Sequence, residues 1–141
     1  IHNHSKLIIH HLTFITQHST LNIQHSTFIT QHNHMPLLTD QPAKPLAPGL
    51  TGYYAHGAQM TLGIVEIKAG SNLPVHQHPH EQITYILEGQ LNMTIEGESC
   101  PLSAGMFHVI PSNVPHGAIA LTDCKVMDVF CPVREDYREQ E

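Results

Sequence analysis

The sequence of 141 residues has no tryptophan, only three cysteines and few basic residues. Six lysines and arginines stand against twelve aspartates and glutamates, so the formal charge at pH 7 is −6. An acidic chain without a basic patch lacks the attraction on which binding to nucleic acids and anionic membranes depends. No apolar run approaches the roughly 18–20 residues of a membrane-spanning helix. The composition therefore predicts that the protein binds neither nucleic acids nor membranes.

The cysteines form no CxxC pair, and their number is odd. They are Cys100, Cys124 and Cys131. This usage is typical of reduced thiols rather than of a disulfide framework. The N-terminal stretch is polar and rich in histidine, without the apolar core and small-residue cleavage site of a secretory leader. Together these features predict a cytoplasmic location.

The first 34 residues contain a repeat and none of the acidic residues, all of which follow Met35. Histidines recur every seven residues at His4, His11, His18, His25 and His32. The repeat units are too rich in Thr and Ile for a coiled coil, and on a strand an odd period changes the apolar face with every unit. We expect residues 1–34 to be a poorly ordered or loosely strand-like extension outside the core, followed by one domain over 35–141. A metal-binding role for this histidine-rich tract is the alternative.

The rest of the chain has short β-prone segments between turns. After a proline-rich approach over residues 35–52, six strands are expected over 60–68, 83–87, 90–96, 106–110, 116–121 and 124–130. The segments recur about every 8–12 residues and end at glycine, proline or asparagine, which is typical of a small β-sandwich or barrel. Only the charged C-terminal residues 134–141 have a helix-like composition. The fold class predicted is all-β.

His76 and His78 stand two residues apart next to a strand-like segment. Residues at this spacing on a strand face the same side, and neutral imidazoles so placed are a common beginning of a divalent metal site. Gln82 follows four residues later, and His116 opens a later strand. The spacing by itself is weak evidence for a metal site, because surface histidines in a loop give the same pattern.

Asp128 is the second chemically unusual position. It shares one face of segment 124–130 with Cys124, Val126 and Phe130, and a carboxylate on such an apolar face is costly unless it is paired or functional. The alternative is a structural salt bridge or turn cap. Arg134 follows after Pro132, where a guanidinium at a barrel mouth could bind a carboxylate in a bidentate manner. Its alternative is a surface charge paired with Glu135 or Asp136.

The spacing around His76 resembles the first cupin motif. Five residues separate Gly70 from His76-x-His78, three separate His78 from Gln82, and six separate Gln82 from Gly89. Gln82 stands where the motif usually has glutamate. The resemblance implies a double-stranded β-helix, or jelly-roll, barrel.

A second stretch resembles the second cupin motif. Gly105 is followed after five residues by Pro111-x-Asn113 and then by His116. Asn113 replaces the usual glycine, a change that asparagine tolerates because it enters the left-handed turn region more readily than most residues. Ala120 replaces the usual final asparagine. Together the motifs imply one divalent transition metal held by His76, His78, Gln82 and His116.

More narrowly, the chain resembles the small cupins of the pectin-degradation protein KdgF family, through HxHPHEQ, PxNVPH and DVFxPxREDY. That resemblance implies an isomerase- or tautomerase-type enzyme that opens 4,5-unsaturated uronates, the sugar acids released from pectin and alginate, into linear keto acids. It implies catalytic roles for Asp128, Phe130 and Arg134. Four neutral ligands leave the double charge of a nickel, zinc, manganese, iron or cobalt ion uncompensated, which favours an anionic ligand.

Two other functions fit the same motifs: an iron dioxygenase that uses the same ligands, and a non-enzymatic cupin that binds a small molecule. We expect a homodimer, as is common among small cupins.

His80 follows a proline and is expected at the rim rather than as a ligand. His108 is expected to be a structural core histidine, and Glu81 to face away from Gln82.

Overall fold

The computed structural model describes residues 35–138, and residues 37–138 belong to one compact unit. The histidine-repeat extension predicted over residues 1–34 lies outside the described residues, so the extension and the boundary after it stay predictions. None of the helices in the described range is long and apolar enough to cross a lipid bilayer.

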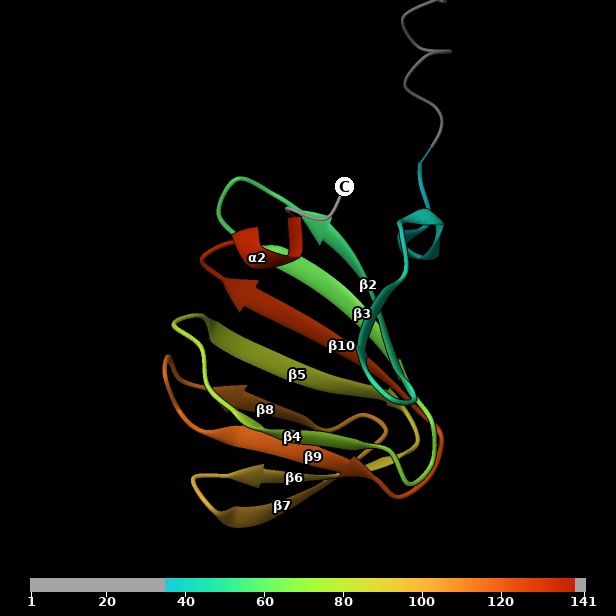
Figure 1. Cartoon of the computed structure of the whole chain (residues 1–141), viewed down its shortest axis with the longest axis vertical. Coiled ribbons are helices and arrows are strands. Elements are labelled where there is room, and N and C mark those ends of the chain that lie inside the picture. The colour runs from blue at the N-terminus through green and yellow to red at the C-terminus, as the bar shows by residue number, and fades with distance from the viewer. Residues whose placement is uncertain (1–34, 139–141) are drawn as a thin grey trace, which may run out of the picture. The chain divides into compact units, whose positions relative to one another are not determined.

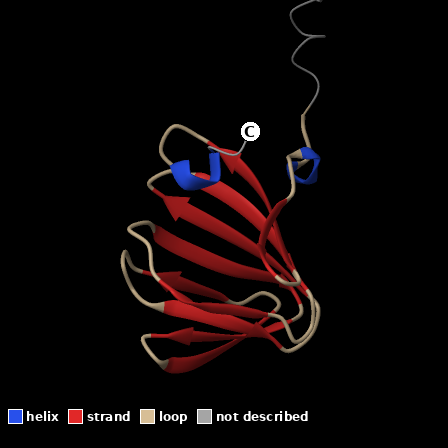
Figure 2. Cartoon of the chain, in the orientation of Figure 1, coloured by secondary structure: helices blue, strands red, loops and turns tan. Residues whose placement is uncertain are grey.

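The unit is built from two antiparallel sheets (Figures 1 and 2). The six-stranded sheet has the order β1 (Lys44–Ala47), β2 (Leu50–His56), β3 (Thr61–Ile67), β10 (Cys124–Cys131), β5 (Glu81–Glu88) and β8 (Phe107–Ile110). The four-stranded sheet has the order β4 (Asn72–His76), β9 (His116–Ala120), β6 (Gln90–Ile95) and β7 (Glu98–Ser103). A short 3-10 helix, η1 (Leu38–Asp40), precedes the strands and one helical turn, α2 (Glu135–Arg138), follows them. The all-β prediction is confirmed.

The core lies between the inner faces of the two sheets. The six-stranded sheet contributes buried residues such as Val65, Ile86 and Val126, and the four-stranded sheet contributes Leu91 and Met93. Burial alternates along β10, as the period of a strand requires when one face is covered. Cys124, Val126, Asp128 and Phe130 are the buried set, which is the inward face predicted from the sequence.

All six expected strands are present, but four further strands were not expected. Three of these contain proline and lie at sheet edges: β1 with Pro45, β4 with Pro74 and β7 with Pro101. Proline removes a backbone donor, which an edge strand tolerates and a central strand does not. The prediction that residues 35–52 are only an approach segment is therefore wrong, because η1, β1 and the start of β2 lie within them.

The turns between strands depend on a few positions with positive φ. Asn113 has a φ of 62°, so it adopts the left-handed conformation in which asparagine replaces glycine at low cost. Gly89, between β5 and β6, has a φ of 88°, and a side chain there would also collide with the backbone of Asp123. The turn at Asn113 leads into β9, which begins with His116.

Candidate metal centre and cavity

Three histidines meet where β4 and β9 pair. His76 ends β4, His116 begins β9, and the two are direct partners in the ladder. His78 lies just beyond β4, so the loop geometry, and not strand alternation as the sequence suggested, brings it to the same side. The possible ligand atoms of the three rings all lie within 4.8 Å of one another.

Each of the three imidazoles is oriented by a backbone carbonyl. The Nδ1 atoms lie 2.9 Å from the Pro74 oxygen for His76, 3.0 Å from the His80 oxygen for His78 and 2.8 Å from the Val114 oxygen for His116. A carbonyl only accepts, so Nδ1 carries the proton in each ring and Nε2 presents a lone pair. Nε2 of His116 is buried without a hydrogen-bond partner among the described residues. An unsatisfied buried acceptor in a histidine cluster fits a bound cation.

Gln82 completes the set of neutral donors. Its Nε2 donates hydrogen bonds to Thr84 Oγ1 at 2.9 Å and to Asp128 Oδ1 at 3.0 Å, so both amide hydrogens are used. Its Oε1 then faces Nε2 of His78 at 3.1 Å. Burial lowers the pKa of His78 to about 4, so this ring is neutral near pH 7 and both facing atoms are acceptors. A cation bound to both would remove that repulsion.

The same network explains why position 82 holds an amide. Asp128 Oδ1 already accepts a 2.7 Å hydrogen bond from the hydroxyl of Thr84, and the Gln82 amide supplies a second donor. A glutamate at this position would place a second carboxylate against Asp128, and like charges at this distance disfavour each other. Gln82 is therefore the residue that satisfies the buried Asp128 while its oxygen is directed at His78.

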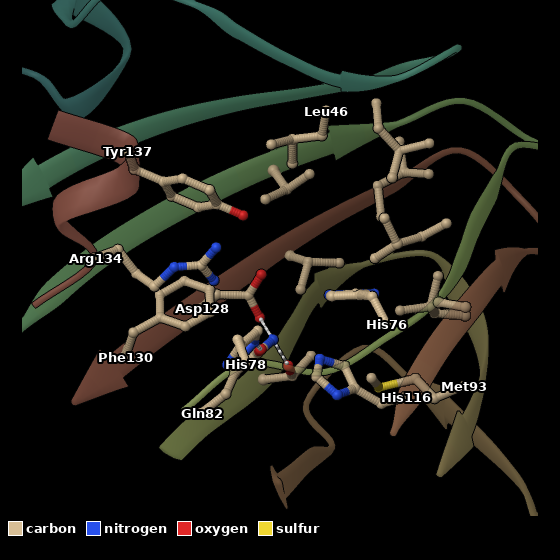
Figure 3. A pocket seen from close by; sticks show the side chains of 18 of the residues that line it. Leu46, His76, His78, Gln82, Met93, His116, Asp128, Phe130, Arg134 and Tyr137 are labelled. Carbon is tan, nitrogen blue, oxygen red and sulfur yellow. Dashed lines mark hydrogen bonds between the residues drawn. The ribbon is translucent and has the colours of Figure 1, made fainter. Parts of the chain in front are cut away.

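Asp128 is buried, with 8% of its surface exposed. Burial raises the pKa of this carboxyl, while the hydrogen bonds from Thr84 and Gln82 and the charge of Arg134 oppose the rise. Oδ1 is held by the network, whereas Oδ2 has no hydrogen-bond partner among the described residues and faces the cavity (Figure 3). One carboxylate oxygen thus holds the Gln82 amide and the Thr84 hydroxyl, and the other faces the cavity.

Arg134 also lines this cavity, but it is tightly held. Its Nε and Nη2 donate to the two carboxylate oxygens of Asp136 at 2.9 and 2.7 Å. Its guanidinium lies 3.8 Å from the ring centre of Tyr137 and 4.9 Å from that of Phe130. The sequence offered the ion pair with Asp136 as an alternative to a position at the barrel mouth. The structure shows both, because the paired Arg134 is 6% exposed and lines the cavity.

Two tyrosines were not identified from the sequence. Tyr54 and Tyr137 line the cavity with ring centres 4.6 Å apart. Tyr54 lies flat on the sheet over Gly63, its ladder partner, and a Cβ added there would come within 2.5 Å of its ring. Burial raises the pKa of both phenols, so they remain protonated donors. Glycines inside two adjacent strands are the sequence signal for such a close approach.

The cavity has a volume of about 290 Å³, close to the lower end of the usual range of ligand sites, about 300–1,000 Å³. It brings together all seven sequence-predicted site residues: His76, His78, Gln82, His116, Asp128, Phe130 and Arg134. The polar side chains gather at one end, whereas aliphatic side chains line the other (Figure 3).

The other singled-out residues lie outside this cavity lining. The ring of His80 does not line the cavity, although its backbone oxygen orients His78. His108 is half-buried, with Nδ1 3.7 Å from Cys100 Sγ. Glu81 is exposed while Gln82 is buried, so the two face opposite ways.

Comparisons with known proteins agree with the fold. The family model described as Cupin domain matches residues 63–130. The structure of KdgF from Halomonas sp. is 31% identical, with a TM-score of 0.68, over 74% of this chain and 98% of that one. An RmlC-like cupin from Shewanella frigidimarina is 26% identical, with a TM-score of 0.68, over 74% and 96%. The pectin degradation protein KdgF of Dickeya dadantii is 36% identical over 64 residues, which are 44% of this chain and 58% of that protein. The match thus spans less than two thirds of this curated relative.

Proposed function

The chain belongs to the cupin family, and we propose that it is a metal-dependent enzyme that converts 4,5-unsaturated uronates into linear keto sugar acids. The likeness to KdgF proteins supports the substrate class. The observation that carries the proposal is that Gln82 links the three neutral imidazoles to a buried carboxylate with one unpaired oxygen. The Gln82 oxygen faces the histidine cluster, while its amide nitrogen donates a hydrogen bond to Asp128.

His76, His78 and His116 through Nε2, and Gln82 through Oε1, would hold one divalent metal. Nickel, zinc, manganese, iron and cobalt all accept imidazole and amide ligands. A metal bound there would polarise an oxygen ligand as a Lewis acid. Because its four protein ligands are neutral, its double charge would not be reduced. Because these four atoms all present lone pairs, they would hold the cation and not the substrate oxygens directly, at a place next to Asp128.

Asp128 carries the proton in this reaction. Its Oδ2 takes the proton of the C1 hydroxyl as the C1–O5 bond breaks, which leaves an aldehyde at C1 and an enolate at C5. Asp128 then returns this proton to C4, so the enolate becomes a ketone and the product has the same atoms as the substrate. The raised pKa of the carboxyl brings it closer to the working pH, where a proton carrier is most effective.

Arg134 binds the substrate carboxylate in this mechanism, and Phe130 forms the wall beside it. The ion pair with Asp136 and the stacking on Tyr137 hold the guanidinium in one orientation. A fixed planar donor loses little entropy when it binds a carboxylate. The protonated Tyr54 and Tyr137 hydroxyls add donors at the same end of the cavity.

Product analysis by nuclear magnetic resonance tests the proposal. The native protein with metal should convert the unsaturated uronate into a species with aldehyde and ketone carbons. Asp128→Ala should lower the rate by about 10²–10⁴-fold, the usual contribution of a positioned acid or base. Full turnover by Asp128→Ala or Arg134→Ala would refute the assigned roles. Oxygen consumption with a diol or thiol substrate would indicate a dioxygenase instead, and ligand binding without any turnover would indicate a binding protein.

A homodimer formed through the outer face of the six-stranded sheet belongs to the same proposal. Two complete apolar rows cross five strands of that face. The first row is Tyr53, Ile64, Met127, Tyr85 and Phe107, and the second is Ala55, Leu62, Val129, Ile83 and Val109. Phe107 is 62% exposed, and contiguous exposed apolar surface of this kind marks association sites.

Sedimentation velocity tests the dimer. Phe107→Lys should shift the native dimer to monomer, whereas the exposed Ile119→Lys, on the other sheet, should leave it dimeric. A monomeric native protein would refute this part of the proposal. The cytoplasmic location, which the three free cysteines favour, stays a prediction.

A further inference from the structure

The cavity changes character along the strands, row by row. The row that crosses the six-stranded sheet at Asp128 also contains Tyr54 and Thr84, and is polar apart from Gly63. The next inward-facing row, one pair of residues further along, contains Gly52, Val65, Val126 and Ile86, with Lys44 at its β1 end. The row after that contains Leu50, Ile67 and Cys124. Rows on one face lie about 7 Å apart, so an apolar region begins about 7 Å from the carboxylate.

The four-stranded sheet closes this region with apolar side chains of its own. We call the region the aliphatic chamber, lined by Leu46, Leu50, Val65, Ile67, Leu73, Leu91, Met93, Ala118 and Val126. In Figure 3 the labelled chamber residues Leu46 and Met93 lie to the right of Arg134 and Tyr137. Most of these residues are buried in the core cluster and lie within strand ladders, whereas Leu46 lies at an irregularity in the pairing of β1 with β2.

The chamber offers no partner to a polar substituent. Its lining side chains carry neither hydroxyl, amide nor charge, and the Tyr54 phenol, which overlies Gly52, lies at its margin. A buried hydroxyl without a partner would weaken binding by roughly 10- to 100-fold. A methylene group placed there strengthens binding by about fourfold. A sugar acid has polar substituents almost all round and gains nothing from this half of the cavity.

We infer that the aliphatic chamber is a second subsite, which takes a compact apolar arm of an anionic ligand. This rests on the proposed function only in assigning the acid group and oxygens of the ligand to the polar end, beside Arg134 and the histidine cluster. Besides the uronates of the proposed function, the ligand class that would use both ends of the cavity is then a carboxylic acid with an oxygen-rich head and an apolar substituent of a few carbon atoms.

Calorimetric titration of the metal-loaded protein tests the inference without requiring turnover. The probes are 2-oxobutanoate, 2-oxopentanoate and 2-oxohexanoate, together with 4-hydroxy-2-oxobutanoate, which matches 2-oxopentanoate in size but ends in a hydroxyl group. Affinity should rise about fourfold with each added methylene, and the hydroxyl analogue should bind at least tenfold more weakly than 2-oxopentanoate. Affinities that do not depend on chain length would overturn the inference.

Two variants at Val65 locate the effect. Val65→Phe fills part of the chamber, so the dependence on chain length should disappear while 2-oxobutanoate still binds. Val65→Thr keeps the shape and adds a hydroxyl, so the difference between 2-oxopentanoate and its hydroxyl analogue should shrink. The control is Ile119→Phe, exposed on the other sheet, which should preserve the native series. An unchanged series in Val65→Thr would place the apolar arm elsewhere and overturn the assignment, even if Val65→Phe does not fold.

The uronate assay is separate from these titrations. A native protein that lacks uronate turnover but shows the chain-length dependence would contradict the proposed function and support the chamber. A protein that turns over uronates with a flat series would do the reverse.

Discussion

Thr84→Val removes one hydroxyl from the centre of the site and leaves the shape of the side chain almost unchanged. Thr84 is 1% exposed and lies directly across the ladder from Asp128. Its hydroxyl donates to Asp128 Oδ1 at 2.7 Å and accepts from Gln82 Nε2 at 2.9 Å. The substitution therefore breaks a hydrogen bond to a carboxylate and leaves a buried amide hydrogen unpaired.

The loss can be estimated from these two effects. A hydrogen bond to a charged group contributes about 1.5–3 kcal/mol, and an unsatisfied buried donor costs about 1–3 kcal/mol. The added methyl group recovers part of this by burial, so the free energy of unfolding should fall by about 2–4 kcal/mol. Because Gln82 also loses its fixed orientation, metal affinity should fall by about 10–100-fold, the usual effect of losing a group that orients a ligand.

Urea denaturation and competitive metal titration measure the two quantities. Thr94→Val is the control, because Thr94 is half-buried on β6 and its hydroxyl has no hydrogen bond in the described structure. This control should change both quantities little. A Thr84→Val protein with native metal affinity would refute the reasoning that the Asp128 network orients Gln82.

Three further substitutions test other parts of the account. Asp136→Asn weakens the bidentate contact that holds Arg134, so the KM for the anionic substrate should rise several-fold with a smaller fall in kcat; steady-state kinetics measure both, and an unchanged KM would contradict the positioning role. Gly63→Ala drives a methyl group into the Tyr54 ring and should lower the free energy of unfolding by about 1–3 kcal/mol, whereas Gly57→Ala, which has room, should not. Asp123 accepts hydrogen bonds from the Ala69 amide and from Lys68. These contacts, the Ala69 hydrogen bond above all, lower the pKa of Asp123 below 3.8. Its contribution to stability is therefore present above pH 3.8 and lost as the pH falls through the lowered pKa, so acid unfolding curves should show a weaker pH dependence for Asp123→Asn, and identical curves would exclude this contribution.

Much of the fold follows from the sequence because burial alternates where the strands are central. Segment 124–130 shows this best, since β10 lies between two neighbours and only one of its faces meets the core. The edge strands β1, β4 and β7 could not be predicted from alternation, because proline and polar residues are tolerated where one side of the ladder is unpaired.

The site follows from the sequence only as far as its motifs reach. Spacing identifies His76 and Gln82, but the role of Thr84 depends on its register opposite Asp128, and that of Tyr54 on its register opposite Gly63. Register is a property of the assembled sheet and is not encoded in the local pattern. For the same reason, the separation of the cavity into a polar and an aliphatic end becomes visible only once the rows are aligned.

The most direct test of the central claim is the absorbance of a 4,5-unsaturated uronate in the ultraviolet, followed with the native protein, with metal-free protein and with no protein. The account predicts that the absorbance disappears much faster with the native protein, that chelation slows it towards the rate without protein, and that added divalent metal restores it. The same rate in all three samples would contradict the account.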